Sequence, residues 1–494
     1  MIDNKVEKKE FLAIKSEITE DGIAINIKGK RHSIKYPKEV WKAYSDINKE
    51  VLLDNLAFML TCHLPAANDK KGAVYGTALP LFETAAFKCT LYDIPSTAVL
   101  AKQRTTEYLK KFFNSTFAFA SYDTVMPDKK ERKSSQKKKP SAIILFTSGK
   151  ESLLTLGLCL ELGIKPIPLF IDEYPDSPES RHKEKIIEKI EREYGIKVLN
   201  ITNDLGELRL NDLEGKKSRW GWGTQFLSYT LEVMPFVQHF DADYLFFGNE
   251  YDCDGYIYDE DGFESSFCFD QRAEWTRQLD IVAKTMTHGS LEVGSIVGNL
   301  WEFGLMKVLH SRYPHLGRLQ MSCTSDTEEG KERIWCGNCS KCGRMFAFFK
   351  ALGIDTQKMG FKDNMFDAKY RQHFSLLSKE GMYGYDSSGI GAEVQATAFF
   401  MAAERGEKGE LIEEFKKMPL YNQIKANIKK KQAEYFSQYE NIAVPYDLKE
   451  KLMDIFEETF KGEFVPKDFR LKQYQEAGNT QEERRVVEEK DPSL

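Results

Sequence analysis

The sequence predicts an α/β protein built on a doubly wound, mostly parallel sheet. From Ser141 onward, short apolar runs of strand length alternate with longer helical patterns, an arrangement typical of parallel sheets. The first apolar run, residues 142–146, breaks into a small, hydroxyl-rich turn at residues 147–152, and a leucine-rich helical pattern follows. In sheets of this kind ligands bind beyond the carboxyl ends of the strands, which is where this turn would lie.

Residues 1–128 predict a smaller α+β region in front of that sheet. Residues 11–37 alternate apolar and polar side chains around two glycine-containing turn signals, and they predict an antiparallel meander. A helical pattern follows at residues 40–62, and residues 75–92 are apolar and rich in aromatic side chains.

A basic linker over residues 129–140 is predicted to separate this region from the central domain. Its lysine-rich, serine-containing composition is typical of a solvated connection between domains. A contact with RNA or phosphate is the alternative interpretation of the same charge run.

The central domain is predicted to span residues 141–355. The apolar runs that we expect to form its strands lie at residues 142–146, 166–171, 197–201 and 244–247. The clearest helical patterns between them lie at residues 181–194 and 224–240.

The chain beyond the central domain predicts a helical extension and a charged tail. Residues 356–477 are mainly helical in pattern and charged, and the apolar stripes at residues 399–401 and 411–415 are expected to form the core of this extension. Residues 478–494 are highly charged and almost without aromatic side chains, which predicts disorder.

Composition limits the classes of function. Hydrophobic residues make up 41% and charged residues 30% of the 494 positions, as in soluble globular proteins. The net charge of −6 argues against a general nucleic-acid or anionic-membrane binder. No apolar run approaches the roughly 18 residues that span a bilayer, and the charged N-terminus has no signal-peptide pattern. We therefore expect a cytoplasmic protein with no membrane partner.

The turn at residues 147–152 has the composition of an anion-binding loop. The free N–H groups of a first helical turn and the helix dipole favour a phosphate there, and small residues allow the backbone to approach it closely. Lys150 adds a positively charged donor. The spacing is not that of a G-x-x-x-x-G-K-[ST] loop. An ordinary strand-to-helix connection with Ser152 as a helix cap is the alternative.

Four of the nine cysteines form a cluster that predicts a metal site. Zn²⁺ takes four thiolates in a tetrahedral array, and two-residue spacers bring thiolates to one ion. Gly337 and Gly343 are expected to permit the tight turns. A closed site of four cysteines has no open coordination position, so its predicted role is structural. An iron–sulfur cluster and metal-free thiols remain alternatives. The predicted ligands are Cys323, Cys336, Cys339 and Cys342.

The other five cysteines are scattered along the chain, and we expect them to be buried apolar fillers. They are Cys62, Cys89, Cys159, Cys253 and Cys268.

The loop resembles the pyrophosphate loop of the PP-loop ATP pyrophosphatases, whose usual form is Ser-Gly-Gly-x-Asp-Ser. Gly149 and Ser152 match that pattern, while Thr147, Ser148 and Glu151 replace Ser, Gly and Asp. We expect the side chain of Ser148 to narrow the binding pocket if this position has a positive φ. The resemblance implies a PP-loop ATP-binding domain with a HUP-like fold over residues 141–355.

Two families of this superfamily share further motifs with the chain, in the same order. The loop, the Gly-Asn-Glu-Tyr-Asp block at 248–252, the Phe-Asp-Gln-Arg-Ala-Glu-Trp block at 269–275 and the cysteine cluster together resemble the 7-cyano-7-deazaguanine synthase family. The ATP-dependent UDP-muramoyl-dipeptide glutamate epimerases carry Ser-Asn-Glu in place of residues 248–250. They also carry a Trp-Cys-x2-Cys-x-Lys-Cys ending that matches residues 335–342. Both resemblances fall within residues 141–353.

Both families imply the same first reaction, in which a carboxylate attacks the α-phosphorus of ATP and pyrophosphate leaves. By this resemblance Mg²⁺ bridges the phosphates, and Lys150, Glu151 and Ser152 are the expected catalytic residues. Glu151 would either orient a Mg²⁺-bound water or cap the helix. The residues expected to bind the nucleotide are Thr147, Ser148, Gly149, Lys150, Glu151 and Ser152. Those expected to bind the acid are Glu250, Asp252, Asp270, Arg272 and Arg277.

The sequence therefore predicts an enzyme that adenylates a small-molecule carboxylic acid, using ATP, Mg²⁺ and a structural Zn²⁺. A 7-cyano-7-deazaguanine synthase-like activity is the leading hypothesis. The alternatives are an epimerase-like enzyme that acts on an adenylated glutamate, and a nucleotide-binding or protein-modifying paralogue. Whether the chain forms a homodimer is left open.

Overall fold

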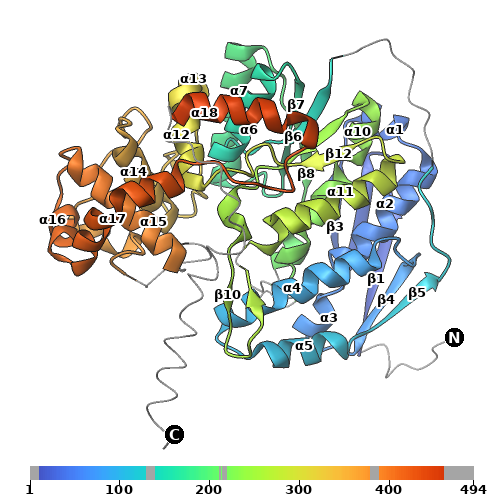
Figure 1. Cartoon of the computed structure of the whole chain (residues 1–494). Coiled ribbons are helices and arrows are strands. Elements are labelled where there is room, and N and C mark those ends of the chain that lie inside the picture. The colour runs from blue at the N-terminus through green and yellow to red at the C-terminus, as the bar shows by residue number, and fades with distance from the viewer. Residues whose placement is uncertain are drawn as a thin grey trace, which may run out of the picture.

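The computed structural model describes residues 10–128, 139–210, 213, 220–266, 268–378, 386 and 389–460. Most of the predicted basic linker and the whole predicted charged tail lie outside these residues. The structure is a mixed α/β arrangement in which helices pack around one large, mostly parallel sheet of ten strands (Figure 1).

One half of the sheet is wholly parallel and contains the four strands predicted from the apolar runs. The short fifth strand at its edge, β12, was not predicted. In sheet order these strands are β12 Glu292–Gly294, β9 Tyr244–Phe246, β6 Ser141–Leu145, β7 Lys165–Asp172 and β8 Leu199–Asn203. The α/β class and the mostly parallel sheet are thus confirmed.

The N-terminal region forms the other half of the same sheet. The predicted meander is present as three antiparallel strands, and two parallel strands extend it outward. In sheet order these are β3 Lys30–Lys35, β2 Gly22–Ile27, β1 Phe11–Ile18, β4 Gly72–Ala78 and β5 Thr116–Ser121. The halves join where Ile34 of β3 pairs antiparallel with Asn203 of β8.

The direction of winding reverses beside β6. The chain passes from β6 to β7 and β8 on one side, and then returns to place β9 and β12 on the other. Ligands of doubly wound proteins bind at such a switch point, beyond the carboxyl ends of the two diverging strands. The loops that follow β6 and β9 both emerge at this point.

Helices of the central part follow the predicted patterns with one difference. The helix α7, Pro178–Tyr194, starts after the Ser177 cap, whose side chain accepts from Ser180 N at 3.0 Å. The predicted helix at 224–240 is two helices that meet at Val233, because Pro235 lacks the N–H that a continuous helix needs.

The remaining elements of the central part are helices and one small hairpin. The α-helices are α6 Lys150–Glu161, α8 Glu207–Leu210, α9 Gln225–Glu232, α10 Met234–Phe240, α11 Ala273–Thr287, α12 Glu302–Arg312 and α13 Pro314–Gly317. The hairpin strands are β10 Ile257–Tyr258 and β11 Glu264–Ser265. The 3-10 helices of the described chain are η2 Trp222–Thr224, η3 Tyr251–Asp254, η4 Phe269–Gln271, η5 Glu329–Lys331, η6 Ala368–His373 and η8 Tyr446–Leu448.

The N-terminal helices cover their half of the sheet. They are α1 Lys38–Ala43, α2 Asp46–Met59, α3 Leu64–Ala67, α4 Glu83–Ala101 and α5 Thr105–Phe113. The β10–β11 hairpin reaches this region, where the Asp261 carboxylate accepts from Thr106 N at 3.0 Å in the first turn of α5. None of the helices in the described parts of the chain is long and apolar enough to cross a membrane.

Further helices follow the central strands in the chain and pack against the sheet. They are α14 Ser340–Leu352, α15 Gly389–Glu404, α16 Glu410–Lys417, α17 Pro419–Tyr435 and α18 Lys449–Phe460. The first lies within the predicted central domain and the other four within the predicted extension, whose residues 461–477 lie outside the described part of the chain. Helices α14 to α17 form a lobe beside the sheet, and α18 returns along α12 (Figure 1). As predicted, the apolar stripes that contain Phe399 and Phe415 are buried, and they belong to the same core as β6 and α6.

Candidate functional site

The loop after β6 is held in shape by its own last residue. The hydroxyl of Ser152 donates to Gly149 O at 3.2 Å and accepts from Thr147 N at 3.3 Å. Gly149 is the N-cap of α6. The N–H groups of the first turn therefore point toward the N-terminal end of the helix, without acceptors inside it. Thr147 is exposed, whereas Ser152 is buried and its hydroxyl bonds the backbone of the loop.

Ser148 has the conformation that would make its side chain intrusive. Its φ is +57°, the left-handed region in which a side chain is strained. The residue has 0% exposure, and among the described residues its hydroxyl has no hydrogen-bond partner. Its carbonyl accepts from Met321 N at 2.9 Å. The hydroxyl is therefore turned into the protein, and the bend is tied to a distant segment.

Lys150 is the centre of a buried charge cluster at the switch point. It is 4% exposed, and its Nζ lies 2.9 Å from Glu302 Oε1 and 3.3 Å from Glu250 Oε1. It also contacts the carboxylate of Glu151. These partners come from the start of α12, the loop after β9 and α6 itself, so three segments meet at one ammonium group.

The electrostatics of this cluster keep Lys150 charged and some acids protonated. Burial opposes the charge of Lys150, but the carboxylates of Glu151, Glu250 and Glu302 outweigh it and raise the pKa of Lys150 well above its usual value. Burial, together with the neighbouring charge of Glu302, raises the pKa of Asp252 to about 7. Burial likewise raises the pKa of Glu250, against the effect of Lys150.

Three of these acids have the arrangement of oxygen ligands for a cation. One carboxylate oxygen from each of Glu250, Asp252 and Glu302 lies within 4.8 Å of the others. Mg²⁺ prefers oxygen ligands and is commonly bound by one or two carboxylates together with phosphate groups. These carboxylate oxygens are therefore of the type that Mg²⁺ prefers, although Lys150 already neutralises part of the negative charge of the carboxylates.

Glu151 lies over the start of α6. A Cβ added at Gly149 would be 2.8 Å from Glu151 Oε2, so this carboxylate folds back across the loop. It also interacts with its own backbone N–H, and burial of the group is outweighed by Lys150, which lowers the pKa of Glu151. Of the two roles considered for Glu151, this geometry is that of a helix cap.

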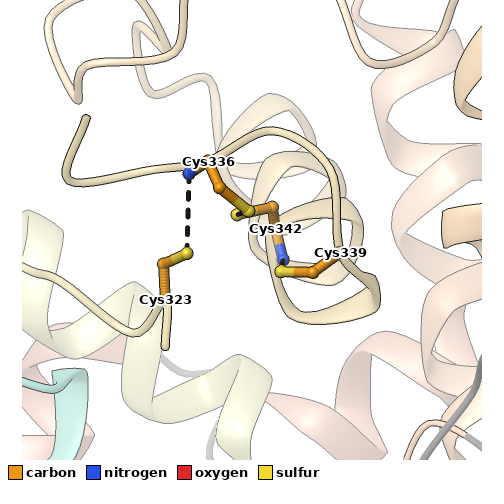
Figure 2. A group of neighbouring side chains, drawn as sticks. All are labelled: Cys323, Cys336, Cys339 and Cys342. Carbon is orange, nitrogen blue, oxygen red and sulfur yellow. Dashed lines mark hydrogen bonds between the residues drawn. The ribbon is translucent and has the colours of Figure 1, made fainter. Parts of the chain in front are cut away.

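The four predicted metal ligands converge, and they form the second part of the site (Figure 2). All four sulfur atoms lie within 4.8 Å of one another, and Cys336 Sγ is 3.7 Å from Cys342 Sγ. Four sulfurs bound tetrahedrally at the usual Zn–S length would lie about 3.8 Å apart. The four cysteines of this cluster are Cys323, Cys336, Cys339 and Cys342.

Backbone N–H groups point at the sulfur atoms, as they do around bound thiolates. The sulfur of Cys323 accepts from Ser325 N at 3.3 Å and from Cys336 N at 3.5 Å. Cys339 is the N-cap of α14, and its sulfur accepts from Cys342 N at 3.4 Å. Hydrogen bonds with the other thiols, Cys323 first, lower the pKa of Cys336. The same thiol contacts, again Cys323 first, raise the pKa values of Cys339 and Cys342.

The two glycines of the cluster have different roles. Gly337 has a φ of +68° and forms the tight turn between the first two cysteines of the run, as predicted. Gly343 does not form a turn, because it lies inside α14. A Cβ there would be 2.4 Å from His373 O, so the glycine allows α14 to pack closely against the end of η6, which lies between α14 and α15.

The scattered cysteines are only partly as predicted. Cys62, Cys89 and Cys159 are buried, but Cys253 and Cys268 are partly exposed at the base of the β10–β11 hairpin.

The five predicted acid-binding residues do not share one place. Glu250 and Asp252 lie in the Lys150 cluster. Arg272 contacts Glu264 at 3.2 Å and lies over the Tyr256 ring. Arg277 is on the exposed side of α11.

Asp270, the fifth, belongs to a separate buried group near Arg209. Burial, together with the charges of Cys268 and Asp93, raises the pKa of Asp270 well above its usual value. Arg209 contacts Glu173 after β7 and is stacked 5.6 Å from the Tyr229 ring. This group also lies at the carboxyl ends of strands, beside β7 and β8.

Sequence reasoning missed Glu302 and Arg344. Glu302 begins α12 and has no motif around it, and Arg344 lies two residues after the last cysteine ligand. Arg344 Nε is 3.5 Å from Glu302 Oε2, so these two residues connect the cysteine cluster to Lys150. Glu302 is itself the acidic residue of the first turn of α12, so the sequence around it gave no independent signal.

No protein-family model matches the chain, and no curated protein matches it significantly. The functional argument therefore depends on the geometry of the site.

Proposed function

We propose that this protein is an ATP-dependent, PP-loop-like enzyme that activates a carboxylic acid by adenylation and releases pyrophosphate. The observation that carries the proposal is the meeting of the loops after β6 and β9 around Lys150. That meeting lies at the switch point of the sheet, where proteins of this architecture bind their ligands.

The loop and the acids have complementary tasks in this proposal. In this proposal the N–H groups of the first turn of α6 bind an anionic phosphate, and Lys150 supplies positive charge. The carboxylates of Glu250, Asp252 and Glu302 would hold Mg²⁺, which shields the negative charge of the phosphates. The excess of acids favours a Mg²⁺-bound triphosphate over a free phosphate ion, because the bare anion would be repelled.

For the cysteine cluster we propose a structural Zn²⁺. The four thiols and their spacing support this assignment, and all four coordination positions would be filled by the protein. The proposed substrate is a small-molecule carboxylic acid, and 7-carboxy-7-deazaguanine is the first acid to test, since the leading resemblance is to the 7-cyano-7-deazaguanine synthases.

Nucleotide titration followed by product analysis tests the proposal. Purified protein is titrated with ATP and Mg²⁺ in a calorimeter and then incubated with the acid and ammonium ions. We expect binding, and formation of AMP and pyrophosphate that depends on the acid. Binding without AMP would instead indicate a nucleotide-binding paralogue. Uptake of solvent deuterium into a glutamyl peptide would indicate the epimerase-like alternative. Absence of binding would reject the proposal.

Replacing Lys150 tests the residue on which the loop depends. Lys150→Met removes one charged hydrogen-bond donor, which is worth about 1.5–3 kcal/mol, so ATP affinity should fall by about 10- to 100-fold. Lys431→Met is the matched control, because Lys431 is also held by two carboxylates, Glu393 and Glu434, but lies in α17. Equal affinities for Lys150→Met and the unaltered protein would remove the loop from nucleotide binding.

A further inference from the structure

We propose that the four-cysteine centre positions the loop after β6, so that a bound metal ion keeps Lys150 buried among its carboxylates. Arg344 is the positioning residue on this route. The inference extends to nucleotide affinity only by resting on the proposed function, whereas the burial of Lys150 can be measured without any nucleotide.

The first connection runs through the backbone before the first ligand. Met321 N donates to Ser148 O at 2.9 Å, and Cys323 follows two residues later. Both Met321 and Cys323 are buried in the same core as β6. A shift of Cys323 would therefore move the hydrogen bond that holds the bend at Ser148, two residues before Lys150.

The second connection runs through side chains after the last ligand. Cys339 caps α14, Cys342 lies in its first turn, and Arg344 follows two residues later in the same helix. Arg344 Nε lies 3.5 Å from Glu302 Oε2, and Glu302 Oε1 lies 2.9 Å from Lys150 Nζ. The start of α14 is thus joined to Lys150 by two successive ion pairs, both among buried side chains.

A metal ion would act on both connections at once. Cys323 belongs to one segment, and Cys336, Cys339 and Cys342 to another (Figure 2). Thiolates packed this closely repel one another unless a cation lies between them, and metal binding draws such segments into one structure. Without the ion the two segments are no longer linked through the cysteines. Met321, which bonds Ser148, and Arg344, which pairs with Glu302, are then held less firmly. We therefore expect Lys150 to become accessible when the metal is removed.

Lysine labelling with mass spectrometry tests this inference. The metal-loaded protein and the protein treated with a zinc chelator are acetylated for short times, and the labelling rate of each lysine is measured. We expect the rate at Lys150 to rise at least tenfold on chelation and to return when Zn²⁺ is added back. Lys431 reports on the helical lobe and should change less than twofold.

Two outcomes of the chelation experiment would overturn the inference. An unchanged rate at Lys150 would show that the cysteine centre does not hold the loop. Equal increases at Lys150 and Lys431 would show that the metal holds the fold as a whole, with no particular effect on this site.

Arg344→Gln separates the positioning role from metal binding. This variant keeps all four cysteines, so its metal content, measured by mass spectrometry of the element, should match that of the unaltered protein. Labelling of Lys150 should nevertheless rise several-fold, because Glu302 loses its second cation. Arg312→Gln is the control. Arg312 ends α12, away from the loop, and pairs with Glu161 of α6 and Glu458 of α18.

The same variant separates this inference from the proposed function. If Arg344→Gln keeps its metal and leaves Lys150 as protected as before, the inference fails, whether or not the protein binds ATP. If the unaltered protein binds no nucleotide, the proposed function fails, while the labelling result stands by itself.

Discussion

Two buried cations lie at the same edge of the sheet, and their surroundings differ. Lys150 follows β6 and contacts three carboxylates from three segments. Arg209 follows β8, is 1% exposed, and contacts the carboxylate of Glu173 while stacking on an aromatic ring. The guanidinium thus lies in a paired, packed setting, whereas the ammonium lies among more acids than it can neutralise.

The difference follows from where each cation lies in the winding of the sheet. The Lys150 group lies between β6 and β9, where the chain changes direction and the strand ends diverge. The Arg209 group lies where β8 meets the N-terminal half, so that half covers it. A Cβ at Gly221 would be 2.8 Å from the Arg209 Cα, which shows how closely the chain packs there. Shifted pKa values occur in both groups, so position in the fold, rather than titration alone, distinguishes the candidate site.

The largest expected effect is the loss of Arg209. Arg209→Met leaves Glu173 as an unpaired buried carboxylate, and the free energy of unfolding should fall by about 3–5 kcal/mol in urea denaturation. The double variant Arg209→Met with Glu173→Leu should recover most of this loss, because it replaces the pair with apolar groups. Lys150→Met should cost less, particularly below pH 7, where its acidic neighbours can take up protons. A greater loss in Lys150→Met would contradict the contrast drawn between the two groups.

The two groups should also differ in the pH range over which their buried carboxyl groups change stability. Burial and the charge of Glu173 raise the pKa of Glu232 to about 8, and that of Asp252 is about 7. Each folded carboxyl keeps its proton above the pKa of the unfolded chain, so each makes stability fall as pH rises. For a single group the slope is roughly 1.4 kcal/mol per pH unit, and it ends at the folded pKa.

Amide variants measure these contributions one by one. In Glu232→Gln, the fall of stability with rising pH that extends to about pH 8 should disappear. In Asp252→Asn, the fall that ends near pH 7 should disappear. Denaturation midpoints between pH 5 and 9 provide the measurement. Glu188→Gln, at an exposed position of α7, is the control for the loss of a carboxylate at the surface. Identical profiles for Glu232→Gln and the unaltered protein would show that Glu232 carries no such proton.

The smallest expected effect lies in the loop itself. Ser148→Gly removes left-handed strain of roughly 1–2 kcal/mol but costs about 0.5–1 kcal/mol through the greater chain entropy of the unfolded state, so the free energy of unfolding should rise by at most about 1.5 kcal/mol. Removing the buried hydroxymethyl also leaves room at the bend, and ATP affinity should rise or stay equal. Ser325→Gly, with the same φ of +57°, controls for the backbone effect. Weaker ATP binding by Ser148→Gly would show that the hydroxyl contributes to the site.

Local patterns predicted the elements well where each element lies in one stretch of chain. The four apolar runs form strands, the meander has its three strands, and the cysteines with two-residue spacing meet at one point. Local pattern failed at 224–240, where one apolar helical stretch concealed a break at Pro235. It also gave Gly343 a turn, although a helix needs glycine equally when another backbone passes close to it.

By itself, the amino-acid sequence determined the strand–loop–helix unit around Gly149 and the set of four thiols, because both depend on neighbours close in the chain. The tertiary structure alone decided that β3 pairs with β8, that Ser148 turns inward, and that Glu302 and Arg344 reach Lys150. Glu302 and Lys150 are far apart in sequence, and the packing of α12 against α6 brings them together. Contacts of this kind depend on how whole elements pack, and no local pattern of residues encodes them.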